Sequence, residues 1–138
     1  MTGRPLHAST LVAVAVGGAA GAVLRHLLGE AFPVDGFPWT TLVINVSGSF
    51  LLALLPAAAV VRRHPLLPPA LGPGLLGGYT TLSAYSEESR ALLADGRFAA
   101  GSLYAVGTLA LCLLAVALAD RFSGPPERSE FEAEDGDL

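Results

Sequence analysis

Charged residues are scarce in this sequence, and lysine is absent. Only 14% of the 138 residues are charged, whereas a soluble domain averages about 25%, and all eight basic residues are arginines. Hydrophobic residues make up 52%. This composition predicts an integral membrane protein. Because a helical crossing takes roughly 20 apolar residues, the length allows at most about four crossings and leaves no room for a second domain.

The sequence also has few groups for covalent or metal chemistry. Its one cysteine, Cys112, lies in an apolar run, which excludes an intrachain disulfide and a cysteine-type metal site. No nucleophile-base pair or His/Cys cluster occurs, so we expect no enzyme, and nothing in the composition indicates nucleic acid. Asp35 and Glu87 bracket a long segment without Asp or Glu. The chain therefore lacks the intramembrane carboxylate that cation-coupled transport usually requires.

Four apolar stretches approach membrane length, at about residues 9–28, 38–61, 66–93 and 98–119. Short polar connections separate them, which predicts an all-α, four-transmembrane-helix domain over residues 1–124 with both termini on one side of the membrane. Residues 125–138 contain six acidic residues and one arginine. A segment this polar cannot bury enough apolar surface to order itself, so we expect a disordered acidic tail.

The third stretch predicts a broken helix. Its segment GPGLLGGYTTLSAYS places glycines and a proline just before Thr80, Thr81 and Ser83, a composition that disfavours a continuous helix. Non-helical backbone at membrane depth is stable only where it is buried in protein or lines a cavity. Such a break offers carbonyls to a cation and a helix N-terminus to an anion. A kinked helix that binds no ligand is the alternative.

Hydrogen-bond donors dominate the polar groups of the other stretches. Asn45 places an amide in the middle of the second stretch, and Tyr104, Thr108 and Cys112 recur every four residues on one face of the fourth. Donors of this kind suit an anion better than a cation. Hydrogen bonding between packed helices is the alternative for these groups. The small residues 17–22 predict a face on which another helix can pack closely.

Together these segments resemble the Fluc (CrcB) family of fluoride channels. The resemblance rests on GGAAGAVLRH (17–26), TTLVINVSGSF (40–50), GGYTTLSAYSEE (77–88) and the spacing of Tyr104 with Thr108. It implies a channel that passively exports cytoplasmic fluoride and so protects against fluoride toxicity. It also implies an antiparallel dual-topology dimer with two pores and a central structural Na⁺. Main-chain carbonyls of Gly77 and Thr80 from each subunit would hold that ion.

The resemblance further implies which residues line the anion pathway and which carry charge beside it. The pathway positions are Asn45, Leu82, Ser83, Tyr85, Tyr104 and Thr108, and the structural or vestibule charges are Arg25 and Glu88. This sequence departs from the family pattern at three positions. Leu82 and Tyr85 stand where the family has phenylalanines, and Ala84 where it has threonine. Leucine has no electropositive ring edge to offer an anion.

The distribution of arginines bears on orientation and partner. The side of the termini and middle loop carries Arg4, Arg62, Arg63, Arg121 and Arg128, and the other side carries Arg25, Arg90 and Arg97. This modest bias favours cytoplasmic termini in a multi-pass protein of the cell membrane. A subunit fixed in one orientation would need a homologous partner, so homodimer and heterodimer both stay open. A small multidrug-type exporter is another alternative, although its first span would need an acid, as is a non-conducting membrane subunit.

Overall fold

The computed structural model describes residues 7–33 and 36–122, and its regular elements are all helical. The long helices are α1 (Ala8–Ala31), α2 (Trp39–Leu54), α6 (Leu82–Ala94) and α7 (Phe98–Ala119). Five shorter elements lie between α2 and α6: the 3₁₀ turn η1 (Leu55–Ala57), α3 (Ala59–Arg62), α4 (Leu67–Pro69), the π-helical η2 (Ala70–Leu76) and α5 (Gly77–Tyr79). The 3₁₀ turn η3 (Asp120–Phe122) follows α7. The acidic segment 125–138 lies outside the described residues.

Three helical segments are long and apolar enough to cross a membrane. They are Ala8–Ala31, Trp39–Ala57 and Phe98–Phe122. Large apolar side chains on them are exposed, among them Val16 at 65% and Leu103 at 68%. Side chains of this kind are stable when lipid surrounds them. The structure therefore supports the prediction of a helical membrane protein.

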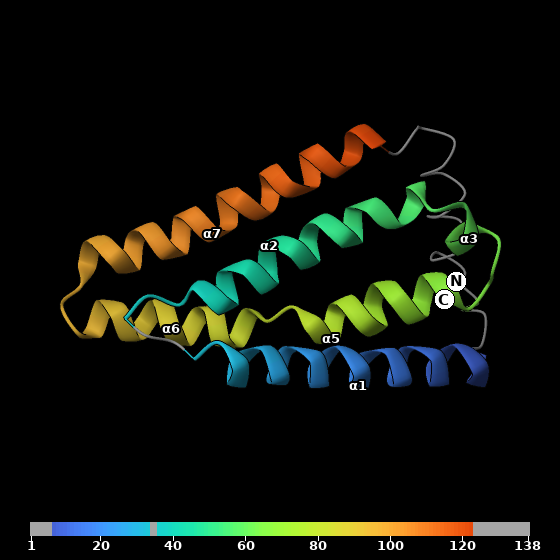
Figure 1. The fold of residues 1–138 in the computed structure, drawn as a ribbon, viewed down its shortest axis with the longest axis horizontal. Helices are drawn as coiled ribbons and strands as arrows, with labels where there is room; N and C mark the ends of the chain where they lie inside the picture. The colour runs from blue at the N-terminus through green and yellow to red at the C-terminus, as the bar shows by residue number, and fades with distance from the viewer. Residues whose placement is uncertain (1–6, 34–35, 123–138) are drawn as a thin grey trace, which may run out of the picture.

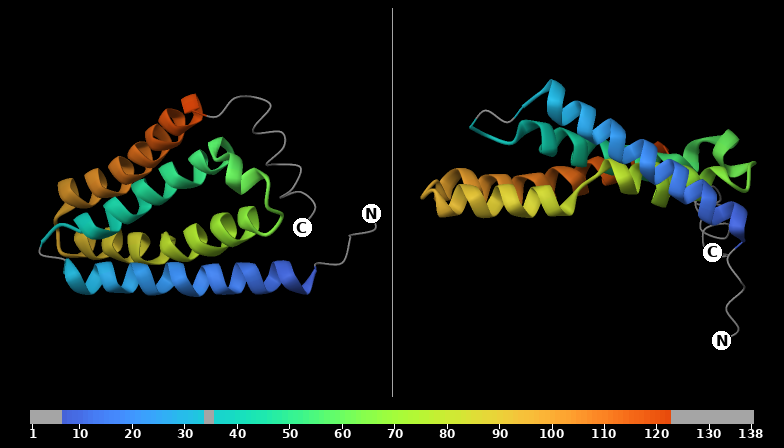
Figure 2. Two further views of the ribbon diagram at one scale, coloured as in Figure 1. Left: turned by 45° about the vertical axis from the view of Figure 1, so that its right-hand side comes forward. Right: turned by 90° about the horizontal axis from the view of Figure 1, so that it is seen from below.

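The helices pack in two groups that the broken segment joins. In Figure 1, α1 lies along α5, whereas α7 lies along α2 and α6. Contacts agree with this view, since α1 packs mainly on η2 and α5, and α7 packs on both α2 and α6. The start of α1, α3 and the end of α7 lie at one end of the molecule (Figures 1 and 2). The α1–α2 and α6–α7 connections lie at the other.

The second helix is shorter than the sequence predicted. We expected this stretch to run to residue 61, but α2 ends at Leu54 and a 3₁₀ turn follows. Pro56 lies in that turn and has no backbone N–H to continue the α-helical ladder. Ala58 is extended, with φ −83° and ψ 103°, and the chain then enters α3.

The predicted break in the third stretch is present, and it falls after the glycines. Thr80 (φ −73°, ψ 161°) and Thr81 (φ −148°, ψ 118°) are extended. The glycine- and proline-rich part before them is helical, most of it as the π-helical η2 with Pro73 inside. The break thus separates α5 from α6 and leaves two half-helices.

Glycines allow α1 to approach η2 and α5 at backbone distance. A Cβ on Gly21 would overlap the carbonyl oxygen of Leu75, and one on Gly78 would overlap the backbone of Gly18. Small residues at such a crossing let van der Waals contacts form where lipid removes the hydrophobic drive for association. This confirms the predicted close packing on the small-residue face of the first helix.

A glycine substitution tests whether this contact holds the fold together. We expect Gly21→Val to lower the thermal stability of the detergent-solubilised protein strongly, because overpacking costs about 1–3 kcal/mol and a backbone carbonyl cannot move aside. Gly29→Val on the same helix is the control, since a Cβ there meets nothing within 4 Å. Equal unfolding temperatures for the two variants would contradict the proposed packing.

Candidate functional site

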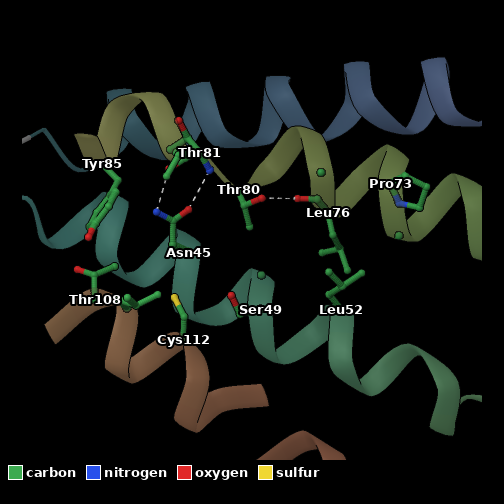
Figure 3. A pocket seen from close by; sticks show the side chains of 15 residues that line it. Asn45, Ser49, Leu52, Pro73, Leu76, Thr80, Thr81, Tyr85, Thr108 and Cys112 are labelled. Carbon is green, nitrogen blue, oxygen red and sulfur yellow. Dashed lines mark hydrogen bonds between the residues drawn. The ribbon is translucent and has the colours of Figure 1, made fainter. Parts of the chain in front are cut away.

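The side chain of Asn45 holds the break in the third stretch. Its Nδ2 donates to the carbonyl oxygen of Thr81 at 3.0 Å, and its Oδ1 accepts from the Thr81 N–H at 2.8 Å. Figure 3 shows these paired bonds, which join α2 to the extended backbone. Thr81 is only 8% exposed, so without Asn45 both backbone groups would lose their partner in a dry environment.

These bonds also divert two N–H groups from the carbonyls that a helix would pair them with. In a continuous helix the Thr81 N–H would bond to Gly77 and the Ala84 N–H to Thr80. Instead Thr81 donates to Asn45, and Ala84 donates to the Thr81 hydroxyl at 3.1 Å. The carbonyls of Gly77 and Thr80 are left without these donors. Unwound carbonyls of this type coordinate Na⁺ in membrane proteins, so these two residues fit the implied ion.

A groove of about 680 Å³ opens beside the break. Residues from α2, η2, α5, α6 and α7 line it, together with the extended pair. Six of the residues expected from the sequence are among them: Asn45, Gly77, Thr80, Leu82, Tyr85 and Thr108. The structure thus brings together predicted pathway and cation positions from three separate stretches (Figure 3).

Thr108 and Asn45, which both line the groove, each carry a donor hydrogen for which no hydrogen bond is seen among the described residues. Thr108 is 3% exposed, and its hydroxyl has no partner among the described residues. Leaving such a group unpaired costs about 1–3 kcal/mol. Asn45 has two amide hydrogens and uses one on Thr81. The groove is thus lined by Thr108, whose buried hydroxyl has no partner among the described residues, and by Asn45, whose amide carries a second N–H.

Two of the three positions that depart from the family pattern, Leu82 and Tyr85, differ in their contacts. Leu82 is 76% exposed, so its side chain makes little contact within the subunit. The hydroxyl of Tyr85 donates to the carbonyl oxygen of Ala105 on α7 at 2.6 Å. Tyr85 is thus anchored across the α6–α7 contact by a bond that phenylalanine could not make.

Glu88 accepts two hydroxyl bonds at once. Tyr104, which is fully buried, donates to its Oε2 at 2.6 Å, and Thr41 donates to its Oε1 at 2.7 Å. Tyr104 and Glu88 were predicted as separate site residues, and the structure joins them in one cluster. Thr41 was not predicted as a member. The signal available in the sequence was its place one helical turn before Asn45 on the same helix face.

Four predicted site residues lie outside the groove lining: Tyr104 and Glu88 of the cluster above, and also Ser83 and Arg25. Ser83 is exposed, and its hydroxyl lies 3.3 Å from that of Thr81. Arg25 is partly buried on α1, and its Nε has no partner in the part of the chain that is described. The structure does not bring Arg25 to the groove.

Comparison with known proteins supplies the family. The model of the CrcB-like protein family, Camphor Resistance (CrcB), matches residues 12–119. The chain belongs to the CrcB-like family. It is 46% identical to the fluoride-specific ion channel FluC of Bordetella avium over 121 residues, which cover 83% of this chain and 92% of the relative. It is 44% identical to the channel of that name from Geobacter sulfurreducens, over 77% of this chain and 90% of the relative.

Family membership bears on several sequence predictions. It confirms the resemblance, and relatives that are ion channels support the expectation that a CrcB-like chain is not an enzyme. It also favours a channel over a multidrug-type exporter. The individual roles of the pathway, sodium and charged residues stay predictions.

The bonds of Asn45 predict a structural cost when its amide is removed. We expect Asn45→Ala to lower the unfolding temperature, because two buried backbone groups of Thr81 lose their partner at about 1–3 kcal/mol each. Ser49→Ala is the matched control, since Ser49 lines the same groove one turn further along α2. Thermal unfolding in detergent measures both. Equal stability of the two variants would show that Asn45 does not hold the break.

Proposed function

We propose that this chain conducts fluoride passively across the cell membrane, and that the groove beside the break forms the wall of the path. The observation that carries the proposal is a groove lined by Asn45 and by Thr108, whose buried hydroxyl has no partner among the described residues. Family membership and relatives named fluoride-specific ion channels support it.

The chemistry of fluoride matches this lining. The ion is small and strongly hydrated, so a path must replace its water with hydrogen-bond donors and still let the ion leave. Hydroxyl and amide donors do this without a fixed positive charge that would hold the ion too tightly. Transport is passive, because the chain offers no carboxylate for coupling. None occurs between Asp35 and Glu87, and the carboxylate of Glu88 already accepts two hydroxyl bonds. The fluoride gradient then sets the direction, out of a loaded cytoplasm.

Two more hydroxyl donors are bonded to the carboxylate of Glu88. The hydroxyls of Thr41 and Tyr104 point at the carboxylate in the structure. A fluoride ion that reaches them must compete with Glu88 for the same two protons. The bonds to Glu88 keep the two hydroxyls oriented while no ion is present. The competition with Glu88 then weakens the binding of an ion that arrives.

Membrane placement follows from the two ends of the molecule. The broken segment α4–α6 would form a fourth crossing beside the three apolar helices. Arg62 and Arg63 lie at the end where α1 starts, which we assign to the cytoplasm with the termini. The aromatic side chains of Phe32, Trp39 and Phe98, each at least 63% exposed, lie near the opposite end and suit the other interface.

A second copy of the chain would complete a cation site. One subunit supplies the Gly77 and Thr80 carbonyls, and a two-fold related copy in antiparallel orientation would supply the same pair again. A Na⁺ ion bound there would offset the repulsion between the partial negative charges of the four carbonyl oxygens. The groove of each subunit would then be covered by its partner.

Two features favour a second candidate, in which a homologous chain replaces the second copy. Five arginines lie on the side of the termini and three on the other, so insertion is biased towards one orientation. The exposed Leu82 also offers no ring to its own pore. If such a partner is required, this chain conducts poorly when it is reconstituted alone.

Replacement of Thr108 tests the proposed path. Thr108→Val keeps the shape of the side chain and removes a hydroxyl that has no partner among the described residues, so the protein should be as stable or more stable. We expect fluoride efflux from liposomes to fall about tenfold or more, because a hydrogen bond to a charged group contributes about 1.5–3 kcal/mol. Thr108→Ser should retain the efflux. Unchanged efflux in the valine variant would remove Thr108 from the path.

Orientation in the membrane tests the choice of partner. We expect a Leu138→Cys label in a Cys112→Ser background to react with an impermeant reagent both in intact cells and in inverted membrane vesicles, because an antiparallel homodimer requires copies inserted both ways. The fraction of copies labelled from each side measures how many are inserted in each orientation. Reaction from one side only would contradict the antiparallel homodimer and favour a homologous partner chain.

A further inference from the structure

The hydroxyls of Tyr79 and Ser47 form a pair between α5 and α2. They lie 3.0 Å apart, and Tyr79 is only 9% exposed. The Ser47 hydroxyl also donates to the carbonyl oxygen of Ile44 at 3.2 Å. Because a serine has one hydroxyl proton, Tyr79 is the donor in the pair and Ser47 the acceptor. The bond therefore runs from the half-helix before the break to the helix that faces it.

Tyr79 lies between Gly77 and Thr80, the two residues whose carbonyls fit a cation, and it is the last residue of α5. Both neighbouring helices approach it at a glycine. A Cβ on Gly21 of α1 would lie 2.7 Å from the Tyr79 nitrogen, and a Cβ on Gly48 of α2 would lie 3.2 Å from the Tyr79 ring. Tyr79 is thus packed between α1 and α2, and the place of the last turn of α5 depends on it.

The pair complements the bonds of Asn45. The Asn45 amide holds the backbone of Thr81, after Thr80, whereas the Ser47 hydroxyl holds the side chain of Tyr79, before it. Asn45 and Ser47 are two residues apart on α2, so one helix fixes the chain on both sides of Thr80.

A helix end that presents carbonyls to a second subunit needs such an anchor. The last carbonyls of a helix have no donor within the helix. At a two-fold axis those of Gly77 and Thr80 would face their counterparts, and like partial charges repel. The spacing and freedom of carbonyl oxygens influence which cation they accept. A bond from Tyr79 to a neighbouring helix resists spreading of these oxygens.

We propose that Tyr79 and Ser47 are positioning residues for the cation site, and that their bond holds the end of α5 so that the Gly77 and Thr80 carbonyls bind Na⁺ in preference to the larger K⁺. This rests on the proposed function and its cation site. Neither Tyr79 nor Ser47 lines the groove, so both act through the backbone of α5.

The experiment measures cation binding through stability and needs no fluoride flux. The purified full chain in detergent is dialysed to equilibrium against choline chloride with increasing Na⁺ or K⁺, and its unfolding temperature is recorded. A cation that binds the folded state raises this temperature with concentration, and we expect wild-type protein to respond to Na⁺ far more than to K⁺. Tyr79→Phe removes only the hydroxyl. It should need about tenfold more Na⁺ for the same stabilisation, because each of two subunits loses a hydrogen bond, and should lose most of its preference over K⁺.

Three further variants separate positioning from general stability. Ser47→Ala should behave as Tyr79→Phe does. Ser47→Thr keeps the acceptor and should keep the wild-type response, since its added methyl has room in the apolar groove of about 490 Å³ that Ser47 also lines. Ser89→Ala removes a hydroxyl that donates to the Tyr85 carbonyl oxygen at 2.7 Å. It should lower the unfolding temperature without changing the Na⁺ concentration required or the preference over K⁺.

The proposal is overturned if Tyr79→Phe keeps both the wild-type Na⁺ requirement and the wild-type preference over K⁺, whatever its unfolding temperature. Equal stability of the wild-type chain in Na⁺, K⁺ and choline would remove the cation site and this inference with it. Fluoride efflux of the wild-type chain is recorded separately in liposomes. A failure of conduction is thereby distinguished from a failure of positioning.

Discussion

A peptide group that leaves a helix at membrane depth must find a new hydrogen-bond partner, and this requirement governs the centre of the molecule. Thr81 is extended and buried, and the Asn45 side chain satisfies both its N–H and its carbonyl. The Thr81 hydroxyl in turn caps α6 through Ala84. The structure can hold a break here because an amide, which offers a donor and an acceptor together, faces it from α2.

Other features of the site follow from this bond pair. The bond pair ties α2 to the break, and Asn45 and Thr108 line the same groove. The diverted N–H groups leave the carbonyls of Gly77 and Thr80 without the donors that a continuous helix would give them. On the far side of the broken segment, glycines seat α1 against η2 and α5 at backbone distance, so the half-helix before the break has little freedom to shift.

Sequence reasoning reached the parts of this arrangement that depend on local chemistry. Glycine and proline before Thr80 predicted a break, and hydrogen bonding between helices was the alternative given for Asn45, whose amide bonds to the extended backbone at the break. The sequence did not locate the break after the glycines, because close packing against α1 keeps them helical. Nor could it find the Glu88 cluster or the Tyr85–Ala105 bond, since these join residues on different helices and depend on how α2, α6 and α7 pack.

The most direct test of the account is ion selectivity of the chain by itself. Liposomes that contain only the purified protein are loaded with fluoride or with chloride, and release of each ion is recorded with an ion-selective electrode while a potassium ionophore balances charge. The account predicts rapid fluoride release and chloride release at the rate of protein-free liposomes. Comparable release of both ions would contradict the account. Fluoride release no faster than without protein would contradict conduction by the chain alone and leave only a channel formed with a homologous partner.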